Sequence, residues 1–209
     1  MRLSPSNKPK AILFDLGGVL IDFIGLREVA KLLPHDPGPS EIRNRWIASE
    51  AIIQFERGGC SAEEFARNFV DEWDLSMNHA RFLTMFQGWI EPPFPGVETL
   101  LAGLRQSYVL AYLSNTNELH WHTMLDQSGL RKSLDKHYAS HLIGAVKPDP
   151  AIFAHVSKDM ECDPSEIVFF DDGMENVVGA RRAGLRAHQV QGFGELRAKA
   201  AQLGLIGGN

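Results

Sequence analysis

Continuous apolar runs that end in polar residues constrain the fold of this 209-residue chain most strongly. Three such runs are AILFDLGG from residue 11, YVLAYLSNTN from residue 108 and EIVFFDDG from residue 166, and a weaker run, RAHQV, begins at residue 186. Runs of this length that are apolar on both faces are typical of buried strands in a mainly parallel sheet. The sequence therefore predicts an α/β fold.

Helical patterns separate these runs, as the connections between parallel strands require. Apolar residues recur at every third or fourth position in VETLLAGLR, residues 97–105, which predicts an amphipathic helix. Asp149 is placed as the N-cap of a further helix over 151–160. A third helix, over 176–183, is expected to end at Gly184.

Residues 22–93 follow a different pattern, because they hold most of the Trp and Phe residues, alternate acidic with basic side chains and show no strand-like run. Helices are expected over 40–58, 61–75 and 79–90, with a shorter one over 25–33. We therefore expect an inserted, all-helical cap domain of residues 22–93, between the two parts of a catalytic core, residues 1–21 and 94–209.

The charge balance excludes some classes of partner. The formal net charge is −5, from 21 basic and 26 acidic residues, and no cluster of Lys or Arg suggests binding to nucleic acid or to an anionic membrane. No apolar stretch approaches the roughly 20 residues of a membrane span. We expect a cytoplasmic protein, a monomer or a homodimer, in which Cys60 and Cys162 are reduced.

Polar side chains follow the predicted strands, where an open parallel sheet binds its ligands. Three carboxylates can hold Mg²⁺, which prefers oxygen ligands, while a hydroxyl, an amide and an ammonium surround a phosphate. One carboxylate is also a competent nucleophile toward phosphorus. The residues that carry these groups are Asp15, Ser114, Asn115, Lys147, Asp171 and Asp172.

Two glycines follow the first predicted strand, shortly after Asp15. Gly17 and Gly18 allow the backbone to turn sharply behind Asp15. Their carbonyl and N–H groups can then approach a metal ion and a phosphate group closely.

With these residues in this order, the chain resembles the haloacid dehalogenase superfamily, and within it the small bacterial phosphatases similar to alpha-D-glucose-1-phosphate phosphatase. FDLGGVLID, LSNTN, VKPDPAIF and VFFDDGMEN resemble the four motifs of the superfamily in the right order. FERGGCSAEEF and PFPGVETLLAGLR resemble stretches that are usual in the smaller group. The resemblance implies a Rossmann-like sheet with a helical cap, and a Mg²⁺-dependent hydrolase of a small phosphorylated metabolite.

The resemblance also implies the metal site. It makes Asp15 both the nucleophile and a metal ligand, with the backbone carbonyl of Gly17 as a second ligand. Asp172 would complete the protein's share of the ligands, and Asp171 would bind the ion directly or through water.

The remaining residues would bind the substrate. Ser114 and Asn115 would hold phosphate oxygens, and Lys147 would neutralise the nucleophile and the transferring group. Gly18 would contribute its backbone, and His120 is expected near the substrate rather than at a metal, because His120 and His122 at i and i+2 of a helix point to different faces.

One position departs from the superfamily. Its phosphatases usually carry a second Asp two residues after the nucleophile, where it acts as general acid and base, and this chain has Gly17 there. General acid help is typically worth about 10²–10⁴-fold, so its loss matters most for poor leaving groups. We therefore expect an activated substrate such as a sugar 1-phosphate, with water, Asp22 or His120 relaying protons.

Other interpretations remain open from the sequence. L-2-haloacid dehalogenases also lack the second Asp, although they need no metal-binding pair such as Asp171 and Asp172. The chain could instead be a phosphate-sensing or scaffolding module with little activity. Arg43 and Arg45 could grip a second anionic group of a substrate, or lie on a solvated helix face.

Overall fold

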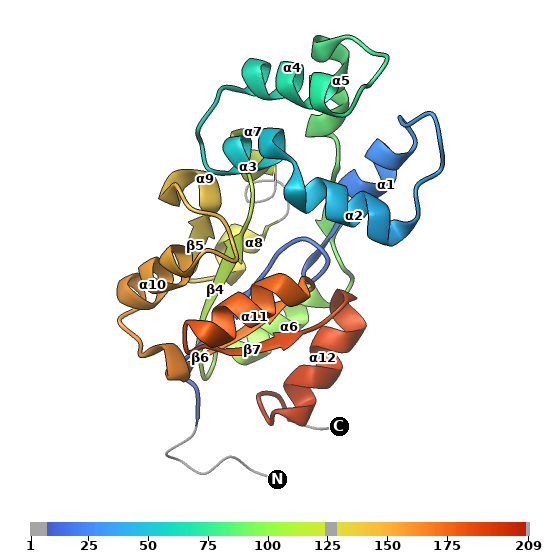
Figure 1. Cartoon of the computed structure of the whole chain (residues 1–209). Coiled ribbons are helices and arrows are strands. Elements are labelled where there is room, and N and C mark those ends of the chain that lie inside the picture. The colour runs from blue at the N-terminus through green and yellow to red at the C-terminus, as the bar shows by residue number, and fades with distance from the viewer. Residues whose placement is uncertain (1–7, 124–128, 208–209) are drawn as a thin grey trace.

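A five-stranded parallel sheet forms the centre of the protein. The computed structural model describes residues 8–123 and 129–207, and its strands lie in the order β5-β4-β1-β6-β7 (Figure 1). Their bounds are Ala11–Phe14 for β1, Val109–Ser114 for β4, Lys136–Ala139 for β5, Ile167–Asp171 for β6 and Arg186–Gln189 for β7. Every pairing between them is parallel, so the predicted α/β fold is confirmed.

Both faces of the sheet are buried, as its continuous apolar runs predict. Ile12 and Phe14 of β1 belong to a core cluster on one face, which also contains residues of α6 (Val97–Leu104) and α12 (Gly192–Gln202). Leu13 belongs to the cluster on the other face, with residues of α10 (Pro150–Asp159) and α11 (Met174–Arg182). Helices therefore cover the sheet on both sides.

Short elements complete the core. They are α7 (Glu118–His122), α8 (Leu130–Ser133), α9 (Ser140–Ile143) and a 3₁₀ turn, Pro164–Glu166. The predicted N-cap of α10 is confirmed, since the Asp149 side chain accepts a hydrogen bond from the Ala151 N–H at 2.9 Å. Strand β5 and helix α12 were not predicted, because the KHYA stretch of β5 is short and half polar and the apolar stripe of α12 is weak.

Five helices form the insertion, which Figure 1 shows beyond one end of the sheet. They are α1 (Gly25–Ala30), α2 (Pro39–Ala48), α3 (Glu50–Glu56), α4 (Ala62–Glu72) and α5 (His79–Gln87). Aromatic residues fill their own core, in which Phe55, Phe65 and Phe69 are almost fully buried. The predicted helical insertion is thus confirmed for α2–α5.

The insertion differs from the prediction in two places. A single helix was expected over 40–58, but Ser49 adopts an extended backbone and caps α3. The last helix was expected to reach Ile90, yet it ends at Gln87, and Ile90–Pro93 forms β3, which pairs antiparallel with β2 (Ile21–Phe23). The insertion is therefore not all-helical, because a two-stranded ribbon joins it to the core. The exact domain boundaries remain a prediction.

Two predictions from composition can be compared with the described residues. Cys60 and Cys162 are free thiols. None of the described helices combines the length and the apolar character that a membrane crossing needs.

Candidate active site

The carboxyl ends of β1, β4 and β6 meet beneath the insertion. Asp15 directly follows β1, Ser114 ends β4 and Asp171 ends β6. A pocket of about 790 Å³ lies between these strand ends and the helices α2 and α3. Its lining includes Asp15, Gly17, Gly18, Ser114, Asn115, His120, Lys147 and Asp172 from the residues predicted for the site, while Asp171 is fully buried behind them.

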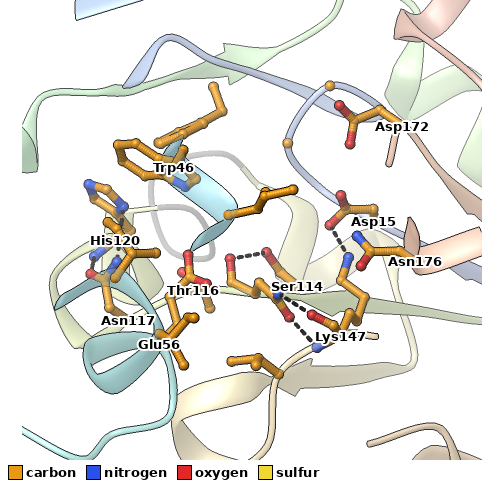
Figure 2. A pocket seen from close by; sticks show the side chains of 18 of the residues that line it. Asp15, Trp46, Glu56, Ser114, Thr116, Asn117, His120, Lys147, Asp172 and Asn176 are labelled. Atoms are coloured by element: carbon orange, nitrogen blue, oxygen red, sulfur yellow. Dashed lines mark hydrogen bonds and ion pairs between the residues drawn. The ribbon is translucent and has the colours of Figure 1, made fainter. Parts of the chain in front are cut away.

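Lys147 joins two of the carboxylates. Its Nζ lies 2.9 Å from Asp15 Oδ1, a contact that Figure 2 marks with a dashed line, and 2.7 Å from Asp171 Oδ2. The Lys147 side chain is almost fully buried. Burial opposes the charge of the Lys147 ammonium, but the two carboxylates outweigh it and raise the pKa of Lys147. The lysine is therefore a fixed positive charge beside Asp15.

Asp171 is held on both oxygens. Its Oδ1 accepts hydrogen bonds from the Gly173 N–H at 2.8 Å and from the Asn176 amide at 3.0 Å, while Oδ2 accepts from Lys147. Three of its roughly four lone-pair positions are thus used by the protein. This geometry favours a structural role for Asp171, or contact with a metal ion through water.

The donor set fits a hard divalent cation. Asp15, Asp171 and Asp172 can bring one oxygen each within 4.8 Å of one another. Burial raises the pKa of Asp15 to about 7, and the charges of Asp171 and Asp172 add to this effect against the opposing charge of Lys147. The cluster therefore carries negative charge that a cation would balance.

Gly18 lets the backbone pass beside Asp172. Its φ is +71°, a conformation that favours glycine, and a Cβ there would lie 3.0 Å from Asp172 Cγ. The predicted sharp turn is confirmed at Gly18. Gly17 has no such backbone requirement, but a Cβ at Gly17 would lie 3.2 Å from Phe23 Cβ, which leaves little room for a side chain.

Asn115 lies at the site, but its side-chain amide is hydrogen-bonded to the protein backbone. Its Nδ2 donates to the Lys147 carbonyl at 3.0 Å, and its Oδ1 accepts from the Lys147 N–H at 2.8 Å. Ser114 is buried at the pocket floor, and its hydroxyl donates to the Asn115 carbonyl at 3.3 Å. Sequence reasoning placed both side chains on phosphate; the geometry of Asn115 instead fixes the segment that carries Lys147.

His120 lies in the pocket wall as a neutral, fully engaged side chain. Its Nε2 donates to the Phe86 carbonyl at 2.7 Å, and its Nδ1 lies 3.3 Å from the Asn117 amide nitrogen. Burial lowers the pKa of His120 to about 4. Because both ring nitrogens are occupied, the geometry disfavours the predicted proton relay. Asp22 is not among the described residues that line the pocket, and it forms an exposed ion pair with Arg27 at 2.8 Å.

Two charged residues of the insertion reach the pocket. Arg43 of α2 contacts Asp172 at 3.2 Å and Glu175 at 3.0 Å, so it points toward the core and not to a solvated face. Glu56, the last residue of α3, lines the same pocket, and burial raises its pKa to about 8. Sequence reasoning missed Glu56; its only signal was a place in the FERGGCSAEEF stretch.

The chain is similar to known proteins over most of its length. Residues 9–184 match the family model described as "Hydrolase: haloacid dehalogenase-like hydrolase". The chain belongs to this family. The predicted enzyme class, a hydrolase, is therefore confirmed.

Two of the relatives that the chain resembles in sequence are phosphatases by name. The chain is 30% identical over 201 residues to a D-ribitol-5-phosphate phosphatase from Bacteroides thetaiotaomicron, covering 90% of this chain and 95% of that one. It is 28% identical to the sesquiterpene phosphatase astK from Aspergillus oryzae, covering 84% and 87%. The magnesium complex of a haloacid dehalogenase family enzyme from Bacteroides thetaiotaomicron superposes with a TM-score of 0.70 at 26% identity, covering 88% and 93%.

Proposed function

We propose that the protein is a Mg²⁺-dependent phosphatase that hydrolyses a small phosphorylated metabolite through a phospho-aspartyl intermediate. The observation that carries this proposal is the position of Asp15, which lies beside the Lys147 ammonium and clusters with the carboxylates of Asp171 and Asp172 at the pocket floor. A carboxylate nucleophile, a fixed cation and a cation-binding cluster are the groups that phosphoryl transfer needs.

In this proposal Asp15 attacks phosphorus and the alcohol leaves. Lys147 stays at Asp15 and balances the charge that accumulates on the phosphoryl oxygens. Asp15, the Gly17 carbonyl and Asp172 would hold Mg²⁺, which would supply further charge neutralisation at those oxygens. Water then hydrolyses the phospho-aspartate and regenerates Asp15.

The phosphate would be bound mainly by the backbone and by one hydroxyl. Ser114 can turn its hydroxyl toward a phosphate oxygen, because its present partner at 3.3 Å is a weak one. Gly18 would contribute its backbone, and Asn115 would act by fixing Lys147. These roles fit the pocket lining.

The side chains in the walls of the pocket indicate which kind of alcohol the substrate carries. Six partly exposed apolar side chains line it, and we call them the apolar wall: Phe23, Leu26, Trp46, Ile47, Ile53 and Ile90. An apolar wall of this extent supports an alcohol that carries apolar surface. The similarity to a sesquiterpene phosphatase agrees with this, whereas a sugar 1-phosphate or ribitol 5-phosphate would rely on the polar groups at the rim.

Initial rates of phosphate release test the proposal. The panel contains glucose 1-phosphate, glucose 6-phosphate, ribitol 5-phosphate, acetyl phosphate and a sesquiterpenyl monophosphate, each with Mg²⁺ or with EDTA. We expect release that depends on Mg²⁺ and is fastest for the ester with apolar surface. Halide release from 2-haloacids without metal would favour the dehalogenase, and binding of phosphate without turnover would favour the sensing module.

A further inference from the structure

We infer that Glu56, supplied by the insertion, is the general acid and base that replaces the carboxylate missing at Gly17. This inference rests on the proposed phosphatase function. It concerns one step, the transfer of a proton to the leaving alcohol, and assigns that step to a residue outside the motifs of the core.

The position of Glu56 is fixed by a close contact between the insertion and the core. Glu56 ends α3, whose first turn is capped by the Ser49 hydroxyl. Two residues further on, Gly58 adopts a φ of +70°, and a Cβ there would lie 2.5 Å from the His141 carbonyl of α9. The end of α3 therefore rests directly on the core, and the Glu56 side chain lines the pocket that contains Asp15 and Lys147 (Figure 2).

The other candidates for this role are unsuitable. A side chain at Gly17 would press on Phe23. Among the described residues that line the pocket Asp22 is absent, and both ring nitrogens of His120 are hydrogen-bonded. By contrast, none of the described residues forms a hydrogen bond with the Glu56 carboxyl, which leaves it free to contact a substrate.

The surroundings of Glu56 favour its acid form at neutral pH. Its pKa is raised to about 8 because burial disfavours the carboxylate and Asp15 adds repulsion, while Lys147 opposes the shift. A general acid works best when its pKa lies near the working pH. The other charged or titratable groups that line the pocket are Arg43, Arg57, His120, Asp149, Asp172 and Glu175.

The proton balance of the proposed step is complete. The P–O bond to the alcohol breaks as Asp15 bonds to phosphorus, and the Glu56 proton passes to the leaving oxygen. The Glu56 carboxylate then takes a proton from water as that water attacks the phospho-aspartate. Asp15 is released as a carboxylate, inorganic phosphate forms and Glu56 is protonated again.

Glu56→Gln tests the inference with two kinds of leaving group. The kcat/KM value reports the steps up to departure of the alcohol, so we expect it to fall about 10²–10⁴-fold for an alkyl phosphate. For 4-nitrophenyl phosphate, whose phenolate leaves without a proton, we expect kcat/KM to change little. Glu50→Gln is the matched control, because Glu50 begins the same helix and does not line the pocket.

The pH profile gives a second readout. In the wild type, kcat/KM for the alkyl phosphate should fall above about pH 8 as Glu56 loses its proton, and Glu56→Gln should lack this descending limb. An equal loss for both leaving groups, or an unchanged limb, would overturn the assignment of Glu56. The proposed phosphatase function fails separately, if the wild type and Glu50→Gln release no phosphate at all.

Stability provides a readout that needs no turnover. A carboxyl whose folded-state pKa lies above its unfolded value destabilises the folded protein, and this penalty grows as pH rises from the unfolded to the folded pKa. Glu56→Gln should therefore raise Tm relative to the wild type, with a gain that increases from about pH 5 to about pH 8. A gain that does not vary with pH would contradict the protonated state of the half-buried Glu56.

Discussion

The side-chain amide of Asn115 forms two hydrogen bonds with the backbone of Lys147, one to its N–H at 2.8 Å and one to its carbonyl at 3.0 Å. This pair ties the end of β4 to the segment that carries the lysine. It explains how a side chain from a loop before α10 reaches Asp15 with a defined position. Asn115 is therefore a positioning residue in the proposed mechanism.

Asn115→Ala should lower phosphatase activity without unfolding the protein. A displacement of Lys147 by about 1 Å can cost about 10²-fold in rate, and we expect a loss of that order in kcat/KM. Steady-state kinetics and a thermal melt together measure it. Asn44→Ala, the same change at an exposed position of α2, is the control. Equal activity in the two variants would show that Lys147 holds its place without the amide.

Lys147→Met should destabilise the protein strongly, because it leaves two buried carboxylates without their cation. Breaking a buried pair in this way costs about 3–5 kcal/mol, measured by denaturant unfolding. Without Lys147 the pKa of Asp15 rises further above its folded wild-type value of about 7, so the loss should shrink as the pH falls toward about 7.

Lys136→Met is the matched control for this change. Lys136 pairs with the exposed Asp159 at 2.8 Å, and an ion pair of this kind is worth about 0–1 kcal/mol. If both lysine variants lost the same free energy of unfolding, the buried ion pairs of Lys147 would contribute no more to stability than the exposed pair of Lys136.

Gly179→Ala should destabilise, although alanine is the better helix former by about 1 kcal/mol. A Cβ at Gly179 would lie 2.7 Å from Pro148 Cβ and 2.8 Å from its carbonyl oxygen, so the segment after Lys147 would have to move. We expect a lower Tm and a lower kcat. Gly103→Ala in α6 meets no atom within 4 Å and should be neutral or stabilising. A stabilised Gly179→Ala variant with normal kcat would argue against a tight contact between α11 and this segment.

Arg43→Met should reduce the Mg²⁺ concentration needed for half-maximal activity. Arg43 pairs with Asp172, a proposed metal ligand, so Mg²⁺ must compete with the Arg43 guanidinium for the Asp172 carboxylate. A partly exposed ion pair is worth about 0–1 kcal/mol, which corresponds to a decrease of up to about fivefold in the Mg²⁺ concentration for half-maximal activity. Mg²⁺ titration of activity measures it. Arg45→Met serves as control, since the Arg45 guanidinium stacks on Trp73 at 4.3 Å. A higher Mg²⁺ requirement in Arg43→Met alone would mean that Arg43 supports the metal site.

Much of the fold could be predicted from the sequence, because buried parallel strands appear as long apolar runs. The runs that begin at residues 11, 108 and 166 form the three central strands, and the ends of the first and third runs hold the acidic cluster. Edge strand β5 and the β2–β3 ribbon could not be predicted, since strands of three or four residues with polar members have no clear period.

The positions of several side chains in the site depend on tertiary contacts that a local sequence pattern does not predict. The partner of the Asn115 amide lies 32 residues away along the chain. Glu56 is a charged residue at the end of a short helix, a place that predicts solvent exposure, and only the packing of α3 on α9 places it in the pocket. His120 lines the pocket, but the Phe86 carbonyl and the Asn117 amide occupy its two ring nitrogens, which its place in the sequence does not reveal.

The measurement that tests the central claim most directly is the initial rate of phosphate release by the wild type and by Asp15→Asn, each with Mg²⁺ and with EDTA. Asp22→Asn, the same change at a residue paired with Arg27, is the control. We predict release that requires Mg²⁺, persists in the control and falls more than about 10³-fold in Asp15→Asn, since the nucleophile is lost. Undiminished release by Asp15→Asn, or release that EDTA does not affect, would contradict the proposed mechanism.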